Sequence, residues 1–216
     1  MHAYCLDLLQ RHVPETFKFN VLTEVTSRML IDRYSKRSGL TTCPAVVQGA
    51  TKHLKRFVDS QLYLSVLGIL REDEIDEDLV PSAVFDSFTA YLRLLRERAY
   101  FDYTSMILLA VEMLEDIDGI TDDRLAAALL GHVRDDMKYL VVDEYQDVNP
   151  LQERLIHGLT QFGANLCVVG DDDQTIYQWR GSEVNNIVAF ADRHEGVKQV
   201  TLDDNWLFTI EGVVGV

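Results

Sequence analysis

The sequence has few cysteines, few basic residues and no long run of apolar residues. Its three cysteines, Cys5, Cys43 and Cys167, lie far apart. They show neither the paired spacing of a zinc site nor a disulfide framework, which favours a reducing compartment. Every apolar stretch is much shorter than the roughly 20 residues that a membrane-spanning helix needs. Charged residues interrupt the first apolar segment early, so we expect no secretory signal and a cytoplasmic protein.

Basic residues are outnumbered by acidic ones. The 216 residues include 20 Lys and Arg against 35 Asp and Glu, which gives a formal net charge of −15. This balance argues against a non-specific nucleic-acid binder, because such proteins usually carry a basic footprint. A local basic or aromatic groove stays compatible with it, since charge fields fade over about 8 Å at physiological salt. The apolar fraction of 47% is ordinary for a globular protein and predicts a buried core.

Helical periodicity runs through the first two-thirds of the chain. Thr121 or Asp122 is a candidate N-cap for the last helix of this region, and Pro81 suits the first turn of an earlier one. Apolar residues recur at helical spacing in several segments. We expect helices near the start of the chain and at about residues 23–34, 45–58, 62–70, 83–98, 103–117 and 123–133.

The pattern changes near residue 138. Two short β-branched runs, at 139–142 and 166–169, are typical of strands that are buried on both faces. We expect helices at about 150–162 and 183–193, and a third strand at 197–202. This alternation predicts a parallel sheet with right-handed crossovers, in which chemistry lies beyond the carboxyl ends of the strands. Acidic clusters stand at two of those ends.

The first acidic cluster is Asp143 and Glu144, directly after the first strand. Adjacent carboxylates at this place suit phosphoryl transfer, because one can hold Mg²⁺ and the next can orient and deprotonate the attacking water. A positioned general base contributes roughly 10²–10⁴ in rate. An Asp-Glu pair can also simply cap a helix or face solvent, so the pair alone leaves both interpretations open.

The second cluster, at 171–173, is followed by Gln174, Tyr177, Trp179 and Arg180. A glutamine in a turn beside a γ-phosphate can sense whether the phosphate is present. Two aromatic side chains with an arginine form a stacking platform for bases, worth ~1–3 kcal/mol per base. The alternative is that the aromatic residues pack in the core and the aspartates form a turn.

Two long segments in this region resemble helicase motifs II and III of the UvrD/Rep-type superfamily 1 DNA helicases. The first reads Asp143-Glu144-Tyr145-Gln146-Asp147-Val148-Asn149-Pro150-Leu151-Gln152. The second reads Val169-Gly170-Asp171-Asp172-Asp173-Gln174-Thr175-Ile176-Tyr177-Gln178-Trp179-Arg180-Gly181. They follow one another in the order of the family, which makes a chance match improbable.

Two shorter segments extend the resemblance. Residues 101–106 are similar to the segment with which the family's helical insert returns to the motor core. The start of the chain resembles a Thr-x-His-Ser-Phe-Cys segment that follows the phosphate loop and touches single-stranded DNA, and it reads Met1-His2-Ala3-Tyr4-Cys5-Leu6-Asp7-Leu8-Leu9.

The resemblance implies an α/β fold: a partial RecA-like parallel sheet of the P-loop NTPase type, with a large all-helical inserted subdomain. We expect an N-terminal motor segment over residues 1–12 and the helical insert over 13–134. The C-terminal part of the first motor domain would then occupy 135–216.

The resemblance also implies roles around ATP. Asp143 would bind Mg²⁺, Glu144 would activate water, and Gln174 would contact the γ-phosphate. Gln146 and Asp147 would tie the two motifs together rather than act on the substrate.

Other residues would face DNA. Tyr177 and Trp179 would stack on bases, and Arg180 would support the strand or the loop. His2 and Tyr4 would lie close to the DNA. The implied partners of the complete protein are single-stranded and duplex DNA.

The sequence departs from the family in two places. No glycine is followed by lysine, so the phosphate loop is missing from this chain, as are the second motor domain and its arginine fingers. After Asn205 and Trp206, Leu207 and Phe208 replace the family's Arg and Ser. We therefore expect a piece of an ATP-dependent DNA helicase that is inactive alone. A weak single-stranded-DNA-binding module and a non-catalytic interaction role remain alternatives.

Overall fold

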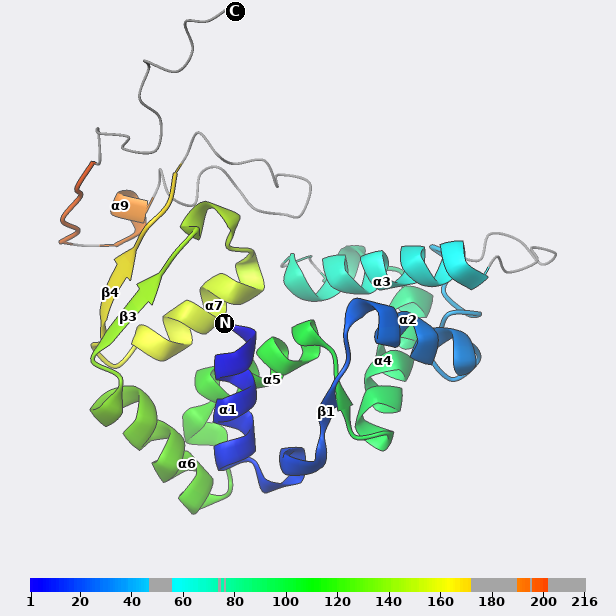
Figure 1. Cartoon of the computed structure of the whole chain (residues 1–216), viewed down its shortest axis with the longest axis horizontal. Helices are drawn as coiled ribbons and strands as arrows, with labels where there is room; N and C mark the ends of the chain where they lie inside the picture. The colour runs from blue at the N-terminus through cyan, green and yellow to red at the C-terminus, as the bar shows by residue number, and fades with distance from the viewer. Residues whose placement is uncertain (47–55, 74, 76, 172–189, 195, 202–216) are drawn as a thin grey trace, which may run out of the picture.

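The computed structural model describes residues 1–46, 56–73, 75, 77–171, 190–194 and 196–201 (Figure 1). The described part is mostly helical and holds two small parallel sheets. Its helices are α1 (His2–His12), α2 (Glu24–Arg33), α3 (Arg56–Glu72), α4 (Ser82–Glu97), α5 (Tyr103–Glu115), α6 (Asp123–Leu130), α7 (Pro150–Thr160) and α9 (Phe190–Arg193). Its strands are β1 (Asn20–Val21), β2 (Tyr100–Phe101), β3 (Tyr139–Val142) and β4 (Asn165–Val168).

The helix starts follow local capping chemistry. Asp122 caps α6, because its side chain accepts hydrogen bonds from the backbone N–H groups of Arg124 and Leu125. Of the two candidate caps, Thr121 and Asp122, the structure therefore selects Asp122. Asp102 and Asn149 each form a reciprocal capping box, at α5 and α7. Pro81 stands just before α4 rather than in its first turn. The helix predicted at 45–58 falls largely outside the described residues, and α3 continues from Arg56 through the segment predicted at 62–70.

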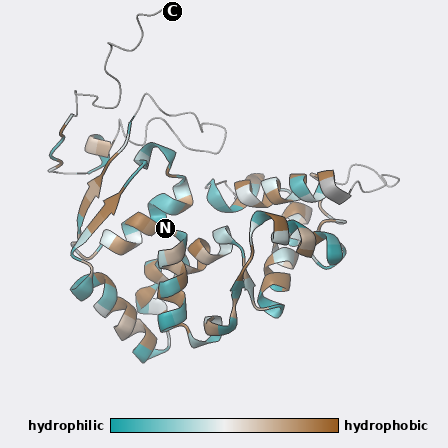
Figure 2. Cartoon of the chain, viewed as in Figure 1, coloured by the Kyte–Doolittle hydropathy of each residue, from teal (hydrophilic) through white to brown (hydrophobic). Residues whose placement is uncertain are grey.

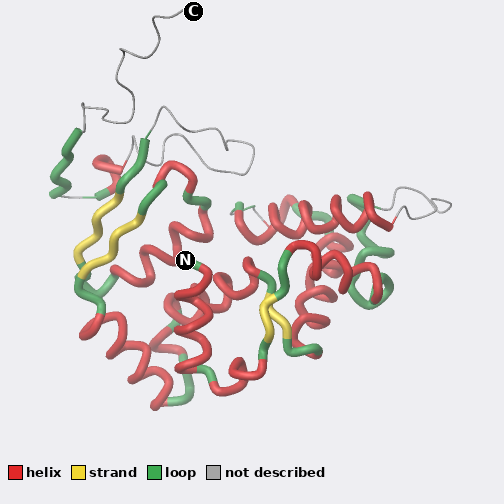
Figure 3. The backbone as a smooth tube through the Cα atoms, in the orientation of Figure 1, coloured by secondary structure: helices red, strands yellow, loops and turns green. Residues whose placement is uncertain are grey.

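Two of the hydrophobic clusters in the described residues are built mainly from helices. Figure 3 shows these helices as two groups of red tubes. One group contains α2, α3 and α4, and the loop at 34–46 closes it. Tyr63 fastens this loop, because its hydroxyl donates to the carbonyl oxygens of Ser38 and Ser87 at 2.7 and 2.8 Å. The fully buried side chains of this cluster include Ile31, Leu40, Tyr63, Leu67 and Tyr91.

The second group contains α1, α5, α6 and α7. Its buried side chains include Leu9, Ala110, Leu114, Leu129, Leu151 and Leu155. Gly158 allows α5 and α7 to approach closely, since a Cβ atom added there would lie 3.0 Å from Cβ of Leu114. The predicted helical region at 13–134 is thus shared between two clusters, and its assignment as one inserted subdomain stays a prediction.

Strands β1 and β2 connect the two groups. They pair in parallel, with Asn20 opposite Tyr100 and Val21 opposite Phe101. In Figure 1 this pair lies between α1 and the α2–α4 group. Along the chain, β1 therefore connects α1 to the α2–α4 group, and β2, paired with β1, connects that group to α5.

Strands β3 and β4 form the predicted parallel pair. The register runs from Tyr139 opposite Asn165 to Val142 opposite Val168, and α7 makes the crossover. Figure 2 colours both strands largely brown, for apolar residues. None of the described helices is long and apolar enough to cross a membrane.

The prediction that these strands are buried on both faces is wrong. One face packs Val142 against Tyr145, Ile156 and Phe190. On the other face, Tyr139 and Val141 are 76% and 67% exposed. The reason is that α7 covers only one side, and within the described residues nothing covers the other.

The C-terminal predictions fare differently. A third strand was predicted at 197–202, and its described part, residues 197–201, forms no strand and pairs with none of the described strands. Val200 in this segment is 70% exposed. Of the helix predicted at 183–193, the described residues form α9, and 183–189 lie outside the description.

Candidate functional site

The carboxylates of Asp143 and Glu144 stand where β3 ends. Both residues are exposed. Oδ1 of Asp143 accepts a hydrogen bond from the backbone N–H of Glu144 at 3.0 Å, which stabilises a turn directly after the strand. Glu144 itself adopts a left-handed backbone, with φ 52° and ψ 44°. This conformation is strained by about 1–2 kcal/mol in a residue with a Cβ atom, and such strain concentrates at functional sites.

Gln146 connects the two acidic clusters. Its Nε2 donates to Oε2 of Glu144 at 2.6 Å, and its Oε1 accepts from the backbone N–H of Asp171 at 3.1 Å. The side chain is only 1% exposed, so it is held firmly between the two loops. The contact predicted between Gln146 and the second motif is present, and the prediction that Gln146 does not act on the substrate stays a prediction.

Backbone hydrogen bonds continue the strand pairing into the loops. The N–H of Val169 donates to the carbonyl of Val142 at 2.8 Å, and the N–H of Tyr145 donates to the carbonyl of Val169 at 3.0 Å. The ends of both strands, with their acidic residues, are thereby kept together. This is the geometry that the parallel-sheet argument predicted for the strand ends.

Tyr145 anchors to α7 the loop that carries Asp143 and Glu144, which runs from Asp143 to Asn149 and is called the carboxylate loop below. Its hydroxyl donates to both carboxylate oxygens of Glu153, at 2.6 and 2.7 Å, and its ring meets the ring of Phe190 edge-on at 5.3 Å. Burial, followed by the hydrogen bond to Glu153, raises the pKa of Tyr145, so the phenol stays protonated and donates. The buried Tyr145 therefore fixes the carboxylate loop to α7 and α9.

Asp147 behaves differently from Gln146. Its Oδ1 atom is buried and has no hydrogen-bond partner among the residues that the structure describes. Its predicted role in tying the motifs together stays a prediction.

The exposed carboxylates of Asp143 and Glu144 are oxygen ligands of the kind that Mg²⁺ takes in proteins. Within the described ranges, no group of three or more His, Cys, Asp or Glu could hold a metal ion. Mg²⁺ commonly takes one or two carboxylates and completes its shell with water and phosphate oxygens. Asp143, exposed at a strand end, suits that role.

The second motif supplies the residues that were predicted to contact phosphate and DNA. Gln174, Tyr177, Trp179 and Arg180 all lie outside the described residues. Their roles stay predictions.

His2 and Tyr4, at the start of α1, face different neighbours. The ring of His2 lies 4.8 Å from the ring of Tyr103, and burial lowers the pKa of His2. The hydroxyl of Tyr4 lies 2.6 Å from Nε2 of His132, and burial raises the pKa of Tyr4 to about 12. The predicted DNA contacts of the two residues remain untested by this geometry.

Sequence reasoning missed one residue beside the site. Glu72, the last residue of α3, accepts a hydrogen bond from Oγ1 of Thr104 at 2.6 Å and another from Nδ2 of Asn149 at 3.2 Å. It stands at the start of an acidic segment that gives no local signal for such a contact. Only the packing of α3 against α5 and α7 brings it to the carboxylate loop.

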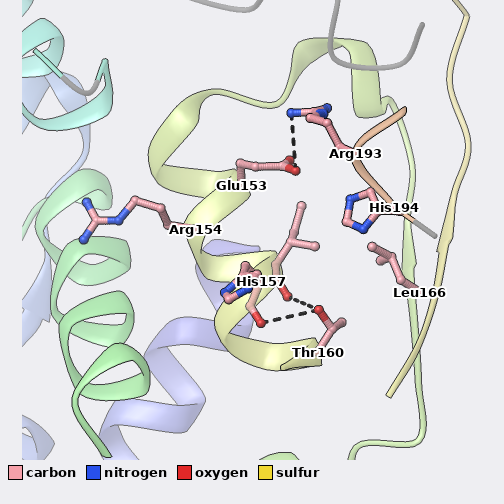
Figure 4. A pocket seen from close by; sticks show the side chains of 8 residues that line it. Glu153, Arg154, His157, Thr160, Leu166, Arg193 and His194 are labelled. Atoms are coloured by element: carbon pink, nitrogen blue, oxygen red, sulfur yellow. Dashed lines mark hydrogen bonds and ion pairs between the residues drawn. The ribbon is translucent and has the colours of Figure 1, made fainter. Parts of the chain in front are cut away.

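A groove of about 270 Å³ lies elsewhere, between α7, β4 and α9 (Figure 4). Arg193 reaches across it, with Nη1 3.8 Å from Oε1 of Glu153. His157, Thr160, Leu166 and His194 are among the other residues that line it. Of the predicted ATP- and DNA-binding residues that the structure describes, namely His2, Tyr4, Asp143 and Glu144, none lines this groove.

Comparison with known proteins agrees with the motifs. The model of the UvrD/REP helicase N-terminal domain matches residues 1–195. The chain is similar to the ATP-dependent DNA helicase PcrA of Staphylococcus epidermidis, with 26% identity over 215 residues, 96% of this chain and 27% of that protein. It is also similar to the ATP-dependent DNA helicases PcrA of Leuconostoc citreum and Bacillus subtilis, with 34% and 32% identity over 126 residues, 58% of this chain and 16% of each relative.

The chain thus spans about a quarter of the length of the Staphylococcus epidermidis relative. The family match covers most of this chain and includes the start of α1, the α2–α4 group and the loop of Asp143 and Glu144. The chain belongs to the UvrD/REP helicase N-terminal domain family.

Proposed function

We propose that this chain carries the metal- and water-binding carboxylates of an ATP-dependent DNA helicase. In this proposal, a phosphate loop and a second motor domain complete the ATP site, and the chain alone does not hydrolyse ATP. The observation that carries the proposal is the contact of Gln146 with both Glu144 and the N–H of Asp171. It holds two acidic strand ends in one arrangement, as a site for a metal–phosphate complex requires.

Each described residue then has a distinct task. Asp143 holds Mg²⁺, which supplies charge stabilisation at the phosphate oxygens when it is bound. Glu144 orients the attacking water and accepts its proton. The Gln146 amide, which donates at 2.6 Å, fixes the direction of the Glu144 carboxylate. Gln174 would contact the γ-phosphate from the second motif.

DNA is the proposed second substrate. Tyr177 and Trp179 would stack on bases of a single strand, with Arg180 supporting them, and His2 and Tyr4 would lie along the same path. Stacking tolerates the acidic composition better than phosphate contacts do, because every base offers a π-face whatever the charge of the protein.

We infer further that the α2–α4 group is the inserted helical subdomain of this family. Two features support this narrower assignment than the predicted 13–134: the group has its own hydrophobic cluster, and β1 and β2 lead into and out of it side by side. By the same packing, α5 and α6 go with the motor domain, since they share a cluster with α1 and α7.

The test is complementation. The purified chain is mixed with a separately produced phosphate-loop segment of a related helicase, and ATP binding and hydrolysis are followed with Mg²⁺ and single-stranded DNA. We expect hydrolysis in the mixture, and its loss with Glu144→Gln or Asp143→Asn. A mixture that contains both folded partners and yet binds no ATP would instead support a non-catalytic role.

A further inference from the structure

The end of α3 meets the starts of α5 and α7 at a single carboxylate. Oε1 of Glu72 accepts a hydrogen bond from the hydroxyl of Thr104, in the first turn of α5, at 2.6 Å. Oε2 of Glu72 accepts from the side-chain amide of Asn149, the N-cap of α7, at 3.2 Å. One residue of the α2–α4 group thus contacts two helices of the other group.

The position of this carboxylate is explained by those contacts and not by its own helix. A negative charge at the C-terminal end of a helix is unfavourable to that helix, because the helix dipole is negative there. The same charge is favourable beside the N-terminal turns of α5 and α7, where backbone N–H groups point outward. The favourable interactions of Glu72 with the starts of α5 and α7 therefore oppose its unfavourable interaction with the dipole of α3.

The preceding residue gives this contact a rigid base. Arg71 is buried, and its Nη1 donates to both carboxylate oxygens of Asp102 at 2.8 Å, while its Nε donates to the carbonyl of Leu67 at 2.9 Å. The hydroxyl of Tyr91 donates to the same carboxylate at 2.9 Å. The end of α3 is thereby fixed to the start of α5, and Glu72 extends from that fixed point to α7.

Asn149 uses both ends of its amide in this arrangement. Its Oδ1 accepts from the N–H of Gln152 at 2.9 Å and so caps α7, while its Nδ2 donates to Glu72. An aspartate would cap the helix equally well but would have no hydrogen to donate. The asparagine side chain is therefore matched to Glu72 as well as to the helix.

Asn149 also ends the carboxylate loop. The loop from Asp143 to Asn149 is held at one point by the contact of Gln146 with Asp171 and at its far end by the contact of Asn149 with Glu72. We propose that Glu72 is a positioning residue that couples the α2–α4 group to the loop carrying Asp143 and Glu144. The consequence of this coupling for hydrolysis rests on the proposed function, whereas the coupling itself does not.

The test is a double-mutant cycle in the full chain, with urea unfolding as the readout. Asn149→Asp preserves the cap and replaces the amide donor by a carboxylate that faces Glu72. We expect Asn149→Asp to lower the urea midpoint by about 0.5 M when Glu72 is present.

The decisive comparison is the same substitution in a Glu72→Gln background. There the glutamine can accept from or donate to its neighbours as required, so we expect Asn149→Asp to leave the midpoint unchanged or raise it. A residue that only capped α7 would show the same effect in both backgrounds, and that result would overturn the proposal. Asp86→Ala, at an exposed position of α4, is the matched control for loss of an acidic side chain.

Amide hydrogen exchange gives the second readout. In Glu72→Ala, we expect exchange in the segment 143–152 to rise by roughly fivefold to tenfold, and Glu72→Gln to restore protection. An increase confined to the end of α3 would contradict the coupling. Neither readout uses ATP. A failed complementation experiment would therefore end the proposed function without affecting this inference. If Asn149→Asp had the same effect in both backgrounds, this inference would be overturned and the proposed function would be unaffected.

Discussion

The side-chain amide of Gln146 donates a hydrogen bond to the carboxylate of Glu144 at 2.6 Å. The oxygen of the same amide accepts from the backbone of Asp171 at 3.1 Å. Because the amide can donate at one end and accept at the other, a single buried side chain satisfies both loops. The direction of the Glu144 carboxylate is therefore linked to the position of the second acidic cluster.

Replacing this amide should destabilise the chain in a graded way. Gln146→Leu removes both hydrogen bonds, and we expect it to lower the free energy of unfolding by about 2 kcal/mol, roughly 1 kcal/mol for each bond. Gln146→Glu keeps the acceptor but places a second carboxylate against Glu144, so its cost should be at least as large at neutral pH and smaller at acid pH. Urea unfolding measures both variants. Equal stability of all three proteins would show that the bridge contributes nothing.

The buried pair of Arg71 and Asp102 should make stability depend on pH. Burial acts to raise the pKa of Asp102, but the charge of Arg71 and the hydrogen bonds from Ser105 and Arg71 outweigh it and lower the pKa. Because the pKa is lower in the folded chain, the pair stabilises the fold above the unfolded value of about 3.9, and this stabilisation is lost as pH falls through the folded value.

Asp102→Asn is the matching variant. It leaves Arg71 buried without its counter-charge, so we expect a loss of about 3–5 kcal/mol at pH 7. The difference from the wild-type chain should shrink as the pH falls below about 4. Unfolding midpoints between pH 7 and pH 3 measure this, and a difference that is independent of pH would contradict the account.

The one-sided burial of β3 predicts opposite behaviour at neighbouring residues. Val141 is 67% exposed and Val142 is 5% exposed. We expect Val141→Thr to change the free energy of unfolding by less than about 0.5 kcal/mol. Val142→Thr buries a hydroxyl among Tyr145 and Ile156 and should cost about 1–3 kcal/mol. Thermal or urea unfolding compares the two, and a cost at Val141 as large as the expected cost at Val142 would mean that both faces of the strand are covered in solution.

Single-stranded DNA should bind weakly and through bases. With a net charge of −15, the chain should show affinity that depends on Tyr177 and Trp179 more than on phosphate contacts. Anisotropy of a labelled oligonucleotide across a salt series measures this. Replacing both aromatic residues by alanine should weaken binding by about tenfold or more, since each stacked base is worth ~1–3 kcal/mol. Unchanged affinity would end the stacking hypothesis.

Local sequence patterns predicted the features that depend on local chemistry. The strand at 139–142 agrees with β3 as observed, Asp122 was one of the two candidate caps of α6, and the contact of Gln146 with the second motif was also expected. Each of these follows from a residue and its near neighbours in the chain, or from the shared edge of two parallel strands.

The features that sequence could not predict depend on which elements meet in space. Periodicity shows that a helix has an apolar face but not what covers it, so the packing of α5 and α6 with α1 and α7 was not foreseen. A β-branched run looks alike whether one or two faces are covered, which explains the error at Val141. Glu72 has no local signal, because its partners lie 32 and 77 residues away along the chain.

The central claim is that this chain holds the carboxylates of the ATP site without the means to use them alone. The most direct measurement is steady-state ATP hydrolysis by the purified chain and by its Glu144→Gln variant, with Mg²⁺ and saturating single-stranded DNA. We predict equal rates at the background level of the assay. DNA-stimulated hydrolysis by the chain alone, abolished by Glu144→Gln, would contradict the account.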